Sequence, residues 1–407
     1  MTDASGGAGR GEATRGVSVP LALLPLGLLA GLLGVLAWSG WLDTMWGERF
    51  PPVEKLAFQR VELRPEGIVA TVLNDGPDPV TVAQVQVDDA YWSFTVEPAA
   101  TLSHLRRATL SIPYPWVEGD AHVVRVVTST GVTFDHEVAV AVETPTPGLR
   151  YFAVFALIGL YVGVIPVAIG LLWRPMVSRV GPEGLDFLMA VTIGLLLFLL
   201  VEAGHDGLEA AALAPGSFQG VALFVMAAGA AFLGLEMVGG WLRGRHGSAG
   251  SGSAVGSGWV LAVLVATGIG LHNFGEGLAI GAAFSLGEAA LGTVLIVGFT
   301  LHNTTEGLAI VAPLANEQVR VGQLVRLGAL GGAPTILGAW IGGLVYSPIW
   351  SVVCLALGAG AIAQVIVQLT RQMAGDRSVA QHVATAPVAG GLFAGVAVMY
   401  VTGLIVG

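Results

Sequence analysis

The sequence predicts a polytopic α-helical membrane protein that carries an N-terminal anchor helix and an inserted all-β sandwich domain. Of its 407 residues, 54% are apolar and 11% are charged, whereas about a quarter of the residues of a soluble globular protein are charged. Long apolar runs recur through the last two thirds of the chain, and one earlier stretch of about a hundred residues alternates between apolar and polar residues instead. This composition excludes an ordinary soluble protein.

The chain begins with a polar segment and one long apolar run. Residues 1–17 are small, polar and rich in glycine, so we expect a disordered cytoplasmic N-terminus. Residues 18–42 are long enough to cross a bilayer and lack a clear cleavage site, which predicts an N-terminal transmembrane anchor rather than a cleaved signal. Arg10 and Arg15 precede this run and place the N-terminus in the cytoplasm.

Residues 46–148 have a different character. Short alternating stretches such as VTVAQVQV and HVVRVVTS are separated by turn signals such as Asn74-Asp75-Gly76-Pro77, and about seven strands fit an Ig-like β-sandwich. Following an anchor that runs outward, this domain would be extracytoplasmic. Residues 45–147 contain 14 acidic and 7 basic residues, a balance that argues against nucleic acid as a partner and favours cations.

Residues 150–407 contain eight apolar runs, each long enough to cross a bilayer. They cover residues 151–173, 185–205, 217–241, 258–283, 289–314, 323–346, 348–370 and 386–406. Arginines fall in alternate connections between these runs, which places those connections in the cytoplasm and the C-terminus outside the cell membrane. Residues 244–257, which include GSAGSGSAVGS, are expected to form a flexible cytoplasmic linker.

One polar phrase occurs twice within these apolar runs, as LHNFGEGLAIG at 271–281 and LHNTTEGLAIV at 301–311. In each copy the histidine and the glutamate are four residues apart and therefore share one helical face. The two helices are expected to be antiparallel, with the histidines at equal depth, about 22 Å from the connecting turn. Because side chains lean toward the N-terminus of their own helix, both carboxylates should lean back toward the histidines.

Two converging copies offer imidazole nitrogens, carboxylate oxygens and amide oxygens, which is the donor set of a divalent cation site. The alternative is a set of interhelical hydrogen bonds that hold the helices together. That alternative explains asparagine and one histidine, but two uncompensated buried carboxylates would cost several kcal/mol. The phrase therefore favours an intramembrane metal site. No prosthetic group is indicated, and the sequence contains no nucleotide-binding loop.

The doubled phrase, the Gly/Ser-rich linker before it, and the later stretches 356–369 and 390–406 resemble the ZIP (Zrt/Irt-like) metal transporters, especially the GufA-like group. The resemblance covers about residues 150–407 and implies an eight-span ZIP-like bundle that moves a divalent transition metal, most commonly zinc, toward the cytoplasm. Fe(II), Mn or Co also suit such donors. The resemblance implies the metal ligands His272, Asn273, Glu276, His302, Asn303 and Glu306.

The sequence departs from the family pattern at three places. Proline usually precedes each glutamate, whereas this chain has Gly275 and Thr305. The glutamate that bridges to a second metal in the sixth span is replaced by Thr335, so one dominant metal site is expected. The cytoplasmic linker, which is often rich in histidine, contains only His246.

A second polar stripe lies where the second span is expected to meet the outer surface. Its members are spaced at i, i+3, i+4 and i+7 and are Glu202, His205, Asp206 and Glu209. They would form an outer relay that strips water from the arriving cation, or an ordinary helix end in contact with water.

The resulting expectation is a multi-pass metal transporter of the cell membrane that is not an enzyme. Its partners would be a divalent metal ion as substrate and the lipid bilayer, without nucleic acid. Two alternatives remain: an intramembrane metallohydrolase, in which His and Glu around zinc activate water, and a metal-sensing receptor that signals through its β domain. The sequence also leaves open a homodimer.

Overall fold

The computed structural model describes residues 19–39, 52–144, 146–247, 257–285, 289–344, 347–375 and 378–406. The contacts divide the chain into two units, Met1–Val53 and Glu54–Gly407, and each unit is described by itself. The predicted disordered segment 1–17 lies outside the described residues, as does most of the predicted linker 244–257.

The described residues of the first unit form the helix α1 (Val19–Ser39), at the position where the sequence predicts the anchor. Its apolar stretch Leu24–Leu36 is shorter than the membrane-length helices of the second unit. The leucines of this stretch are exposed in the unit taken alone, as in Leu28, which is 67% exposed. The role of α1 as a membrane anchor stays a prediction.

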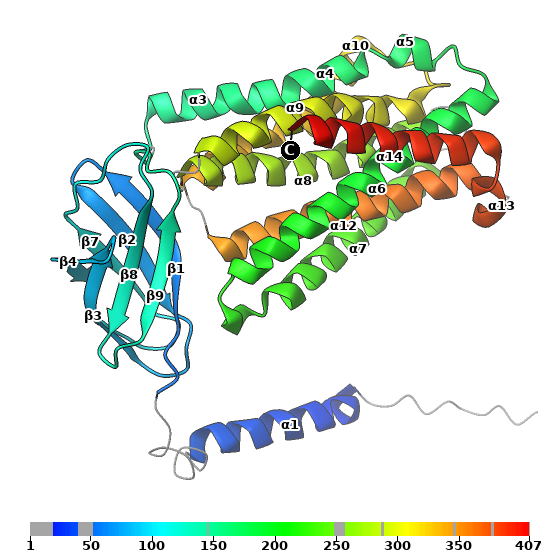
Figure 1. Ribbon diagram of the computed structural model, residues 1–407. Coiled ribbons are helices and arrows are strands. Elements are labelled where there is room, and N and C mark those ends of the chain that lie inside the picture. The colour runs from blue at the N-terminus through cyan, green and yellow to red at the C-terminus, as the bar shows by residue number, and fades with distance from the viewer. Residues whose placement is uncertain are drawn as a thin grey trace, which may run out of the picture. The chain divides into compact units, whose positions relative to one another are not determined.

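The second unit begins with a β domain made of two antiparallel sheets (Figure 1). In the first sheet the strand order is β1 (Leu56–Arg64), β2 (Gly67–Asn74), β7 (Arg107–Ile112) and β5 (Thr95–Glu97). In the second sheet it is β4 (Ala90–Trp92), β3 (Val80–Val87), β8 (His122–Thr128) and β9 (Thr133–Val138), and β6 (Thr101–Leu102) pairs with β3. The sequence predicts about seven strands, and the described residues form nine, because the predicted stretch 91–96 is divided between β4 and β5 and the two-residue strand β6 is added.

The alternating pattern of these strands produces a shared core between the two sheets. Residues i and i+2 of a strand point to the same face, and Val124 and Val126 of β8 are fully buried together with Ile68 and Leu110 of the other sheet. Gly67 makes the tight turn between β1 and β2 possible, because its φ of +140° and its contact with the backbone of Ile112 and Pro113 leave no room for a side chain.

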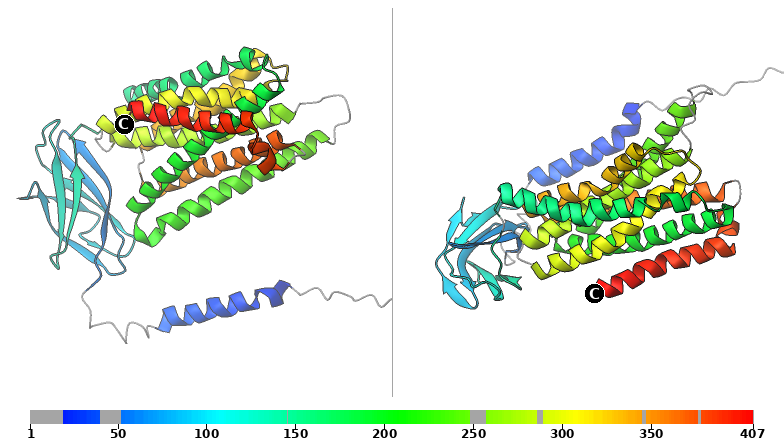
Figure 2. Two further views of the ribbon diagram at one scale, coloured as in Figure 1. Left: turned by 45° about the vertical axis from the view of Figure 1, so that its right-hand side comes forward. Right: turned by 90° about the horizontal axis from the view of Figure 1, so that it is seen from above.

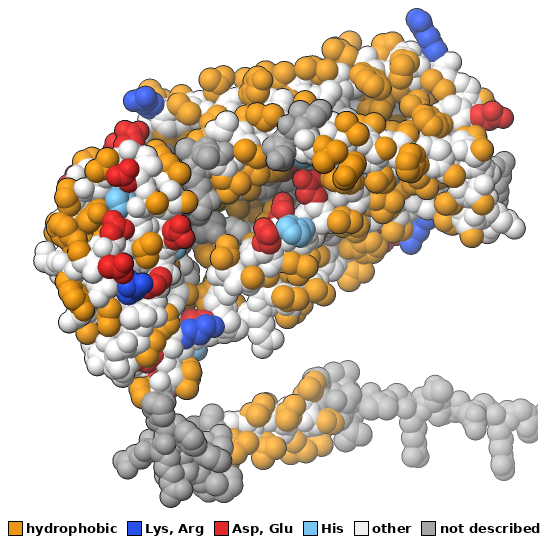
Figure 3. All heavy atoms as spheres, viewed as in Figure 1, with side chains coloured by type: hydrophobic (Ala, Val, Ile, Leu, Met, Phe, Trp, Pro, Cys, Tyr) orange, Lys and Arg blue, Asp and Glu red, His pale blue; other side chains and the backbone are white. Residues whose placement is uncertain are grey.

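Eight helical stretches of the described residues are long and apolar enough to cross a membrane, which confirms a multi-pass membrane protein. They are Leu149–Val177, Pro182–Leu213, Gly216–Trp241, Gly258–Phe284, Leu291–Leu314, Val321–Leu344, Pro348–Ala374 and Ala386–Leu404. Each coincides with one of the eight apolar runs expected from the sequence. Figure 3 shows their largely apolar surface.

Several of these stretches are built from more than one element. The first contains α3 (Leu149–Gly159), the π-helical turn η1 (Leu160–Val164), α4 (Ile165–Leu171) and α5 (Arg174–Val177). The next ones are α6 (Pro182–Leu213), then η2 (Gly216–Phe218) with α7 (Gly220–Gly247), then α8 (Ser257–Ser285), and α9 (Ala289–Val311) with η3 (Ala312–Leu314). The last are α10 (Val321–Gly332) with α11 (Pro334–Leu344), α12 (Pro348–Ala374), and α14 (Ala386–Val406), which follows the short helix α13 (Val379–Val383).

The long helices form two groups. The first group consists of α3, α4, α8, α9, α10 and α11, and the second consists of α6, α7, α12 and α14. Figures 1 and 2 show both groups as layers of nearly parallel and antiparallel helices. Helix α12 packs against α8 and makes the largest contact between the groups.

Small residues bring α8 and α11 into backbone contact. A Cβ added to Gly277 of α8 would collide with the carbonyl oxygen of Thr335, and one added to Gly338 of α11 would collide with the carbonyl oxygen of Phe274. Such close approach is typical of membrane helices packed through small residues. This contact fixes α8, which carries the first copy of the repeated phrase, against α11.

Candidate metal site

The two copies of the repeated phrase lie on α8 and α9, which are packed against each other. Both helices continue through the phrase without a break, so the histidine and the glutamate of each copy are separated by one helical turn. All six polar side chains predicted as ligands are buried, and none is more than 8% exposed.

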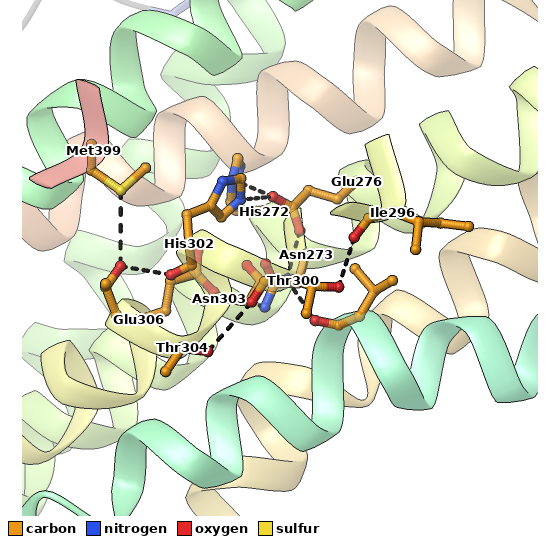
Figure 4. Close-up of polar contacts among 12 residues, drawn as sticks. His272, Asn273, Glu276, Ile296, Thr300, His302, Asn303, Thr304, Glu306 and Met399 are labelled. Carbon is orange, nitrogen blue, oxygen red and sulfur yellow. Dashed lines mark hydrogen bonds and ion pairs between the residues drawn. The ribbon is translucent and has the colours of Figure 1, made fainter. Parts of the chain in front are cut away.

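His272, Glu276 and His302 form a compact group whose ligand atoms lie within 4.8 Å of one another. The Glu276 carboxylate contacts His302 through Nε2, and its Oε1 lies 3.3 Å from Nε2 of His272. The two imidazole centroids are 6.3 Å apart, and Figure 4 shows both rings directed at the Glu276 carboxylate. The structure therefore brings together side chains from both copies, thirty residues apart in the sequence.

The two asparagines are arranged in the same way in the two halves. Asn273 Nδ2 donates hydrogen bonds of 3.0 Å to Glu306 Oε2 and to the backbone carbonyl of Gly331. Asn303 Nδ2 donates hydrogen bonds of 3.0 Å to Glu276 Oε2 and to the backbone carbonyl of Val162. Each asparagine thus orients the carboxylate of the other copy and ties it to a third helix.

The two carboxylates differ, although the sequence predicts that both lean toward the histidines. Glu276 contacts both histidines and Asn303. Glu306 accepts a hydrogen bond from Asn273 through Oε2, while its Oε1 is buried and has no hydrogen-bond partner within the described ranges. The asparagines of the two copies therefore make equivalent contacts, whereas the glutamates do not.

Several polar atoms around this group are buried without a hydrogen bond among the described residues. They are Asn273 Oδ1, Asn303 Oδ1, Glu306 Oε1 and Thr335 Oγ1, and His272 Nε2 has the ion-pair contact of 3.3 Å with Glu276 but no hydrogen bond. An unsatisfied buried polar group costs about 1–3 kcal/mol, and more when it is charged. Each of these atoms has a lone pair that a cation could accept, so a bound cation would remove this cost for every atom that it contacts.

The charge of the group also fits a dication. With neutral imidazoles, Glu276 and Glu306 contribute two negative charges, and in the described part of the chain the ion pairs of these carboxylates involve histidine only. Uncompensated buried charges are strongly unfavourable. A divalent cation between the two copies would balance this pair of carboxylates.

The residues at which this sequence differs from the ZIP transporters that it resembles have clear local roles. Thr305 replaces the usual proline of the second copy, and its hydroxyl donates a hydrogen bond of 2.6 Å to the backbone carbonyl of His302. Gly275 faces Leu355 of α12, where an added Cβ would make an ordinary contact at 3.4 Å. Thr335 is fully buried, and its hydroxyl packs against Gly163, so it offers one neutral oxygen where a carboxylate is usual.

The structure separates the four residues of the predicted outer relay. The side chains of His205, Asp206 and Glu209 are 70%, 45% and 69% exposed, and His205 lies 3.6 Å from a carboxylate oxygen of each of the other two. Figure 3 shows a histidine and acidic side chains gathered at a hollow in the apolar helical surface. These three residues meet water, as both interpretations of the stripe require.

Glu202 occupies a different position from the rest of the stripe. It lines a cavity of about 230 Å³ together with His302, Phe299, Met399 and Thr402. Its Oε2 is buried and has no hydrogen-bond partner among the described residues. The cavity thus lies between the Glu202 side chain and the imidazole of His302.

The sequence analysis missed two components of the site, the carbonyls of Val162 and Gly331. Both carbonyls lie where a helix is irregular: Val162 is in the π-helical turn η1, and Gly331 precedes the break between α10 and α11 at Ala333. Gly331-Gly332-Ala333-Pro334 is a recognisable helix-breaking signal, and Pro166, four residues after Val162, lacks the N–H that would bond the Val162 carbonyl in a regular helix. The sequence does not show which side chain donates a hydrogen bond to such a carbonyl.

Comparison with protein-family models and with curated proteins finds no match for this chain.

Proposed function

We propose that this protein transports a divalent transition metal ion, with Zn²⁺ as the preferred cargo, through the site between α8 and α9. The single observation that carries the proposal is the group of His272, Glu276 and His302, buried at 8%, 3% and 5% exposure and contributed by both copies of the phrase. A set of hydrogen bonds serving only to hold helices together would leave fewer acceptor atoms unpaired.

The donor atoms support the choice of cargo. Imidazole nitrogen with carboxylate and amide oxygen suits Zn²⁺, Fe²⁺, Mn²⁺ and Co²⁺, and sites for Cu⁺ favour sulfur ligands. Mg²⁺ and Ca²⁺ prefer oxygen-only sites. Two imidazoles at one point therefore favour a transition metal over the alkaline earths.

The cavity beside Glu202 supports transport over a closed structural site. It reaches from His302 to Glu202, which lies one helical turn before the exposed residues His205, Asp206 and Glu209 on α6. Acidic groups along such a path attract a cation and replace part of its water shell. A purely structural metal site would gain nothing from a cavity that ends at one of its ligands.

Orientation and family membership belong to the same proposal. On this proposal the chain is an eight-span ZIP-like transporter of the cell membrane, with its β domain and C-terminus outside and its N-terminus in the cytoplasm. The positive-inside distribution of arginines supports this orientation. Transport toward the cytoplasm is taken from the resemblance to the ZIP transporters.

The test measures Zn²⁺ flux into proteoliposomes loaded with a chelating dye. The wild type should produce a saturable signal, and Glu276→Gln should lower the initial rate at least about tenfold, because it removes the carboxylate that both imidazoles share. The matched control is Glu137→Gln, an exposed carboxyl of the β domain, which should retain the wild-type rate. Equal rates for wild type and Glu276→Gln would contradict the proposal.

The same preparation separates the two alternative functions. An intramembrane metallohydrolase would cleave a lipid or peptide in a metal-dependent reaction without Zn²⁺ flux. A metal-sensing receptor would bind Zn²⁺ saturably without flux and would lose its response when residues 46–148 are deleted. Zn²⁺ flux that depends on Glu276 excludes both as the main activity.

A further inference from the structure

The turn between β2 and β3 is bonded to the connection between α6 and α7. Asp75 Oδ2 accepts a hydrogen bond of 2.7 Å from the backbone N–H of Gly216, and Oδ1 accepts one of 3.1 Å from that of Ser217. The Ser217 hydroxyl donates a hydrogen bond of 3.1 Å to the backbone carbonyl of Asp75. Lys55 completes the contact, with Nζ 2.6 Å from Asp75 Oδ2. We call these four residues the latch.

The latch is a built contact rather than a chance surface pair. The side chain of Asp75 is fully buried, and its backbone N–H donates a hydrogen bond of 2.8 Å to the carbonyl of Lys55. Burial alone would raise the pKa of Asp75, but the hydrogen bonds from Lys55, Ser217 and Gly216 outweigh burial and lower it. A buried carboxylate held by several donors is strongly oriented.

The β domain is tied to the other helical group by separate contacts. Its last segment is held to β1 by two hydrogen bonds of 2.9 Å between Leu63 and Thr144, and it continues directly into α3. Arg60 of β1 donates a hydrogen bond of 2.6 Å to the carbonyl of Leu344, the last residue of α11. Both α3 and α11 belong to the first helical group.

The latch therefore joins the two helical groups through the β domain. The α6–α7 connection belongs to the second group, whereas the covalent link to α3 and the bond to Leu344 belong to the first. Any relative movement of the two groups at this side of the membrane must stretch or break one of these contacts. The β domain acts as a rigid bridge because its two sheets share a continuous core.

The cavity that leads to the metal site lies between the same two groups. Its lining includes Glu202 of α6 and Thr402 of α14 from the second group, and Phe299 and His302 of α9 from the first. Figure 1 shows that α6 and α14 both end toward the β domain. The separation of the two groups at this side therefore sets the width of the cavity.

We propose that Asp75 is a positioning residue that holds the α6–α7 connection so that the cavity beside Glu202 stays open toward the β-domain side. The cargo reaches His302 while the latch is closed, and the latch must open when the two groups move to expose the site to the other side. This inference rests on the proposed transport function.

The test measures the reactivity of Thr402→Cys, a half-buried position in the cavity lining, in a background in which Cys354, a free cysteine, is replaced by serine. The full-length protein is treated with a water-soluble maleimide in the absence of metal. Asp75→Ala should slow the labelling rate at least about threefold, because release of the latch lets the cavity close. An unchanged or faster labelling rate would overturn the inference.

Two further variants separate release of the latch from damage to the β domain. Ser217→Pro removes the N–H and hydroxyl donors from the helical side of the latch, and proline is tolerated in the first turn of a helix. It should slow labelling in the same way as Asp75→Ala. Asp89 follows β3, at the end of the strand opposite to Asp75, and its side chain is 85% exposed. Asp89→Asn should therefore leave the labelling rate unchanged. A labelling rate that falls in one of the variants Asp75→Ala and Ser217→Pro and rises in the other would overturn the inference.

The labelling rate is measured without metal, so the latch inference can be contradicted independently of the proposed transport function. If wild-type protein shows no Zn²⁺ flux while both latch variants slow labelling, the transport proposal is wrong and the latch stands as a conformational contact. If flux is present and the latch variants leave both labelling and flux unchanged, the latch inference alone is wrong.

Discussion

At the scale of single residues, the least expected feature is the difference between the two glutamates of a repeated phrase. Glu276 contacts two imidazoles, whereas Glu306 contacts an asparagine and has one oxygen without a partner among the described residues. Closely similar local sequence thus produces two roles, because α8 is enclosed by α11 and α12 while α9 faces α4 and the cavity. Glu276 holds the centre of the site, and Glu306 is free to complete it.

This difference predicts unequal effects of the same substitution. Glu276→Gln should weaken Zn²⁺ binding at least about tenfold more than Glu306→Gln, because glutamine at 276 removes the charge between two imidazoles and leaves both without an ionised partner. The measurement is isothermal calorimetry of metal-free protein in detergent, with circular dichroism to check folding. Equal losses for the two variants would show that the carboxylates are equivalent.

Glu202 is expected to act on the rate of transport and not on the affinity of the site. Its carboxyl faces the cavity and lies outside the group of His272, Glu276 and His302. Glu202→Gln should therefore raise the KM for Zn²⁺ uptake several-fold and leave the Kd of the site within a factor of about two. The exposed His205 provides the comparison, and His205→Ala should have a smaller effect on KM. A Kd that rises as much as KM would make Glu202 a ligand.

The residue types of the site were predictable because they are costly in an apolar run. His272, Asn273 and Glu276 and their counterparts in the second copy stand out from the composition alone. Pro166 and the Gly331-Gly332-Ala333-Pro334 segment mark in the sequence where helical carbonyls lose their partners, but they do not show that the asparagines bind the carbonyls of Val162 and Gly331. The asymmetry of the glutamates also depends on neighbours that the phrase does not contain.

At the scale of elements, the site depends on two irregular helices that surround two regular ones. The π-helical turn η1 and the break between α10 and α11 each supply the carbonyl that binds one asparagine. Helices α8 and α9 can remain continuous because their partners supply the irregular backbone. The same arrangement lets Gly275 and Thr305 stand where the ZIP transporters that the sequence resembles have proline.

The backbone contact between α8 and α11 leads to a prediction about stability. Gly277→Val should destabilise the protein by about 1–3 kcal/mol, because the added side chain meets the carbonyl of Thr335 and forces the helices apart. Gly229→Val of α7 is the matched control, since an added Cβ there meets no atom within 4 Å, and both variants carry the same helix-propensity cost. Thermal unfolding of the two proteins in the same detergent is the measurement.

If the two valine variants unfold at the same temperature, α8 and α11 are not held together by backbone contact.

The membrane-length helices themselves were predictable from hydrophobic length, and each of the eight was found. Their grouping was not, because apolar helices carry little information about which neighbour they pack on. Glycines such as Gly277 and Gly338 indicate where two helices can approach closely, but they do not indicate which helix is the partner.

At the scale of the whole molecule, the β domain and the helices are connected through both helical groups. The sequence predicted the β domain from its alternating pattern and turns, and the structure confirms a small domain of two sheets. It did not predict the contacts of Asp75 and Arg60 with the helices, because the sequence gives each of them the appearance of an ordinary surface charge. Their partners are backbone groups of distant segments.

The orientation of the molecule is tested by cysteine labelling in the Cys354→Ser background. Asp89→Cys of the β domain should react with a membrane-impermeant maleimide on intact cells, and Arg179→Cys of the α5–α6 connection should react only after the membrane is permeabilised. Both positions are exposed, so their reactivity reports the side of the membrane. The reverse pattern would invert the proposed topology and the direction of transport with it.

The central claim is that histidines from both copies of the phrase hold one metal ion. X-ray absorption at the zinc edge of the protein loaded with one equivalent of Zn²⁺ tests this claim most directly. The account predicts a first shell of nitrogen and oxygen with two imidazoles, reduced to one imidazole in His272→Ala and in His302→Ala alike. A shell that keeps two imidazoles in either variant would contradict it.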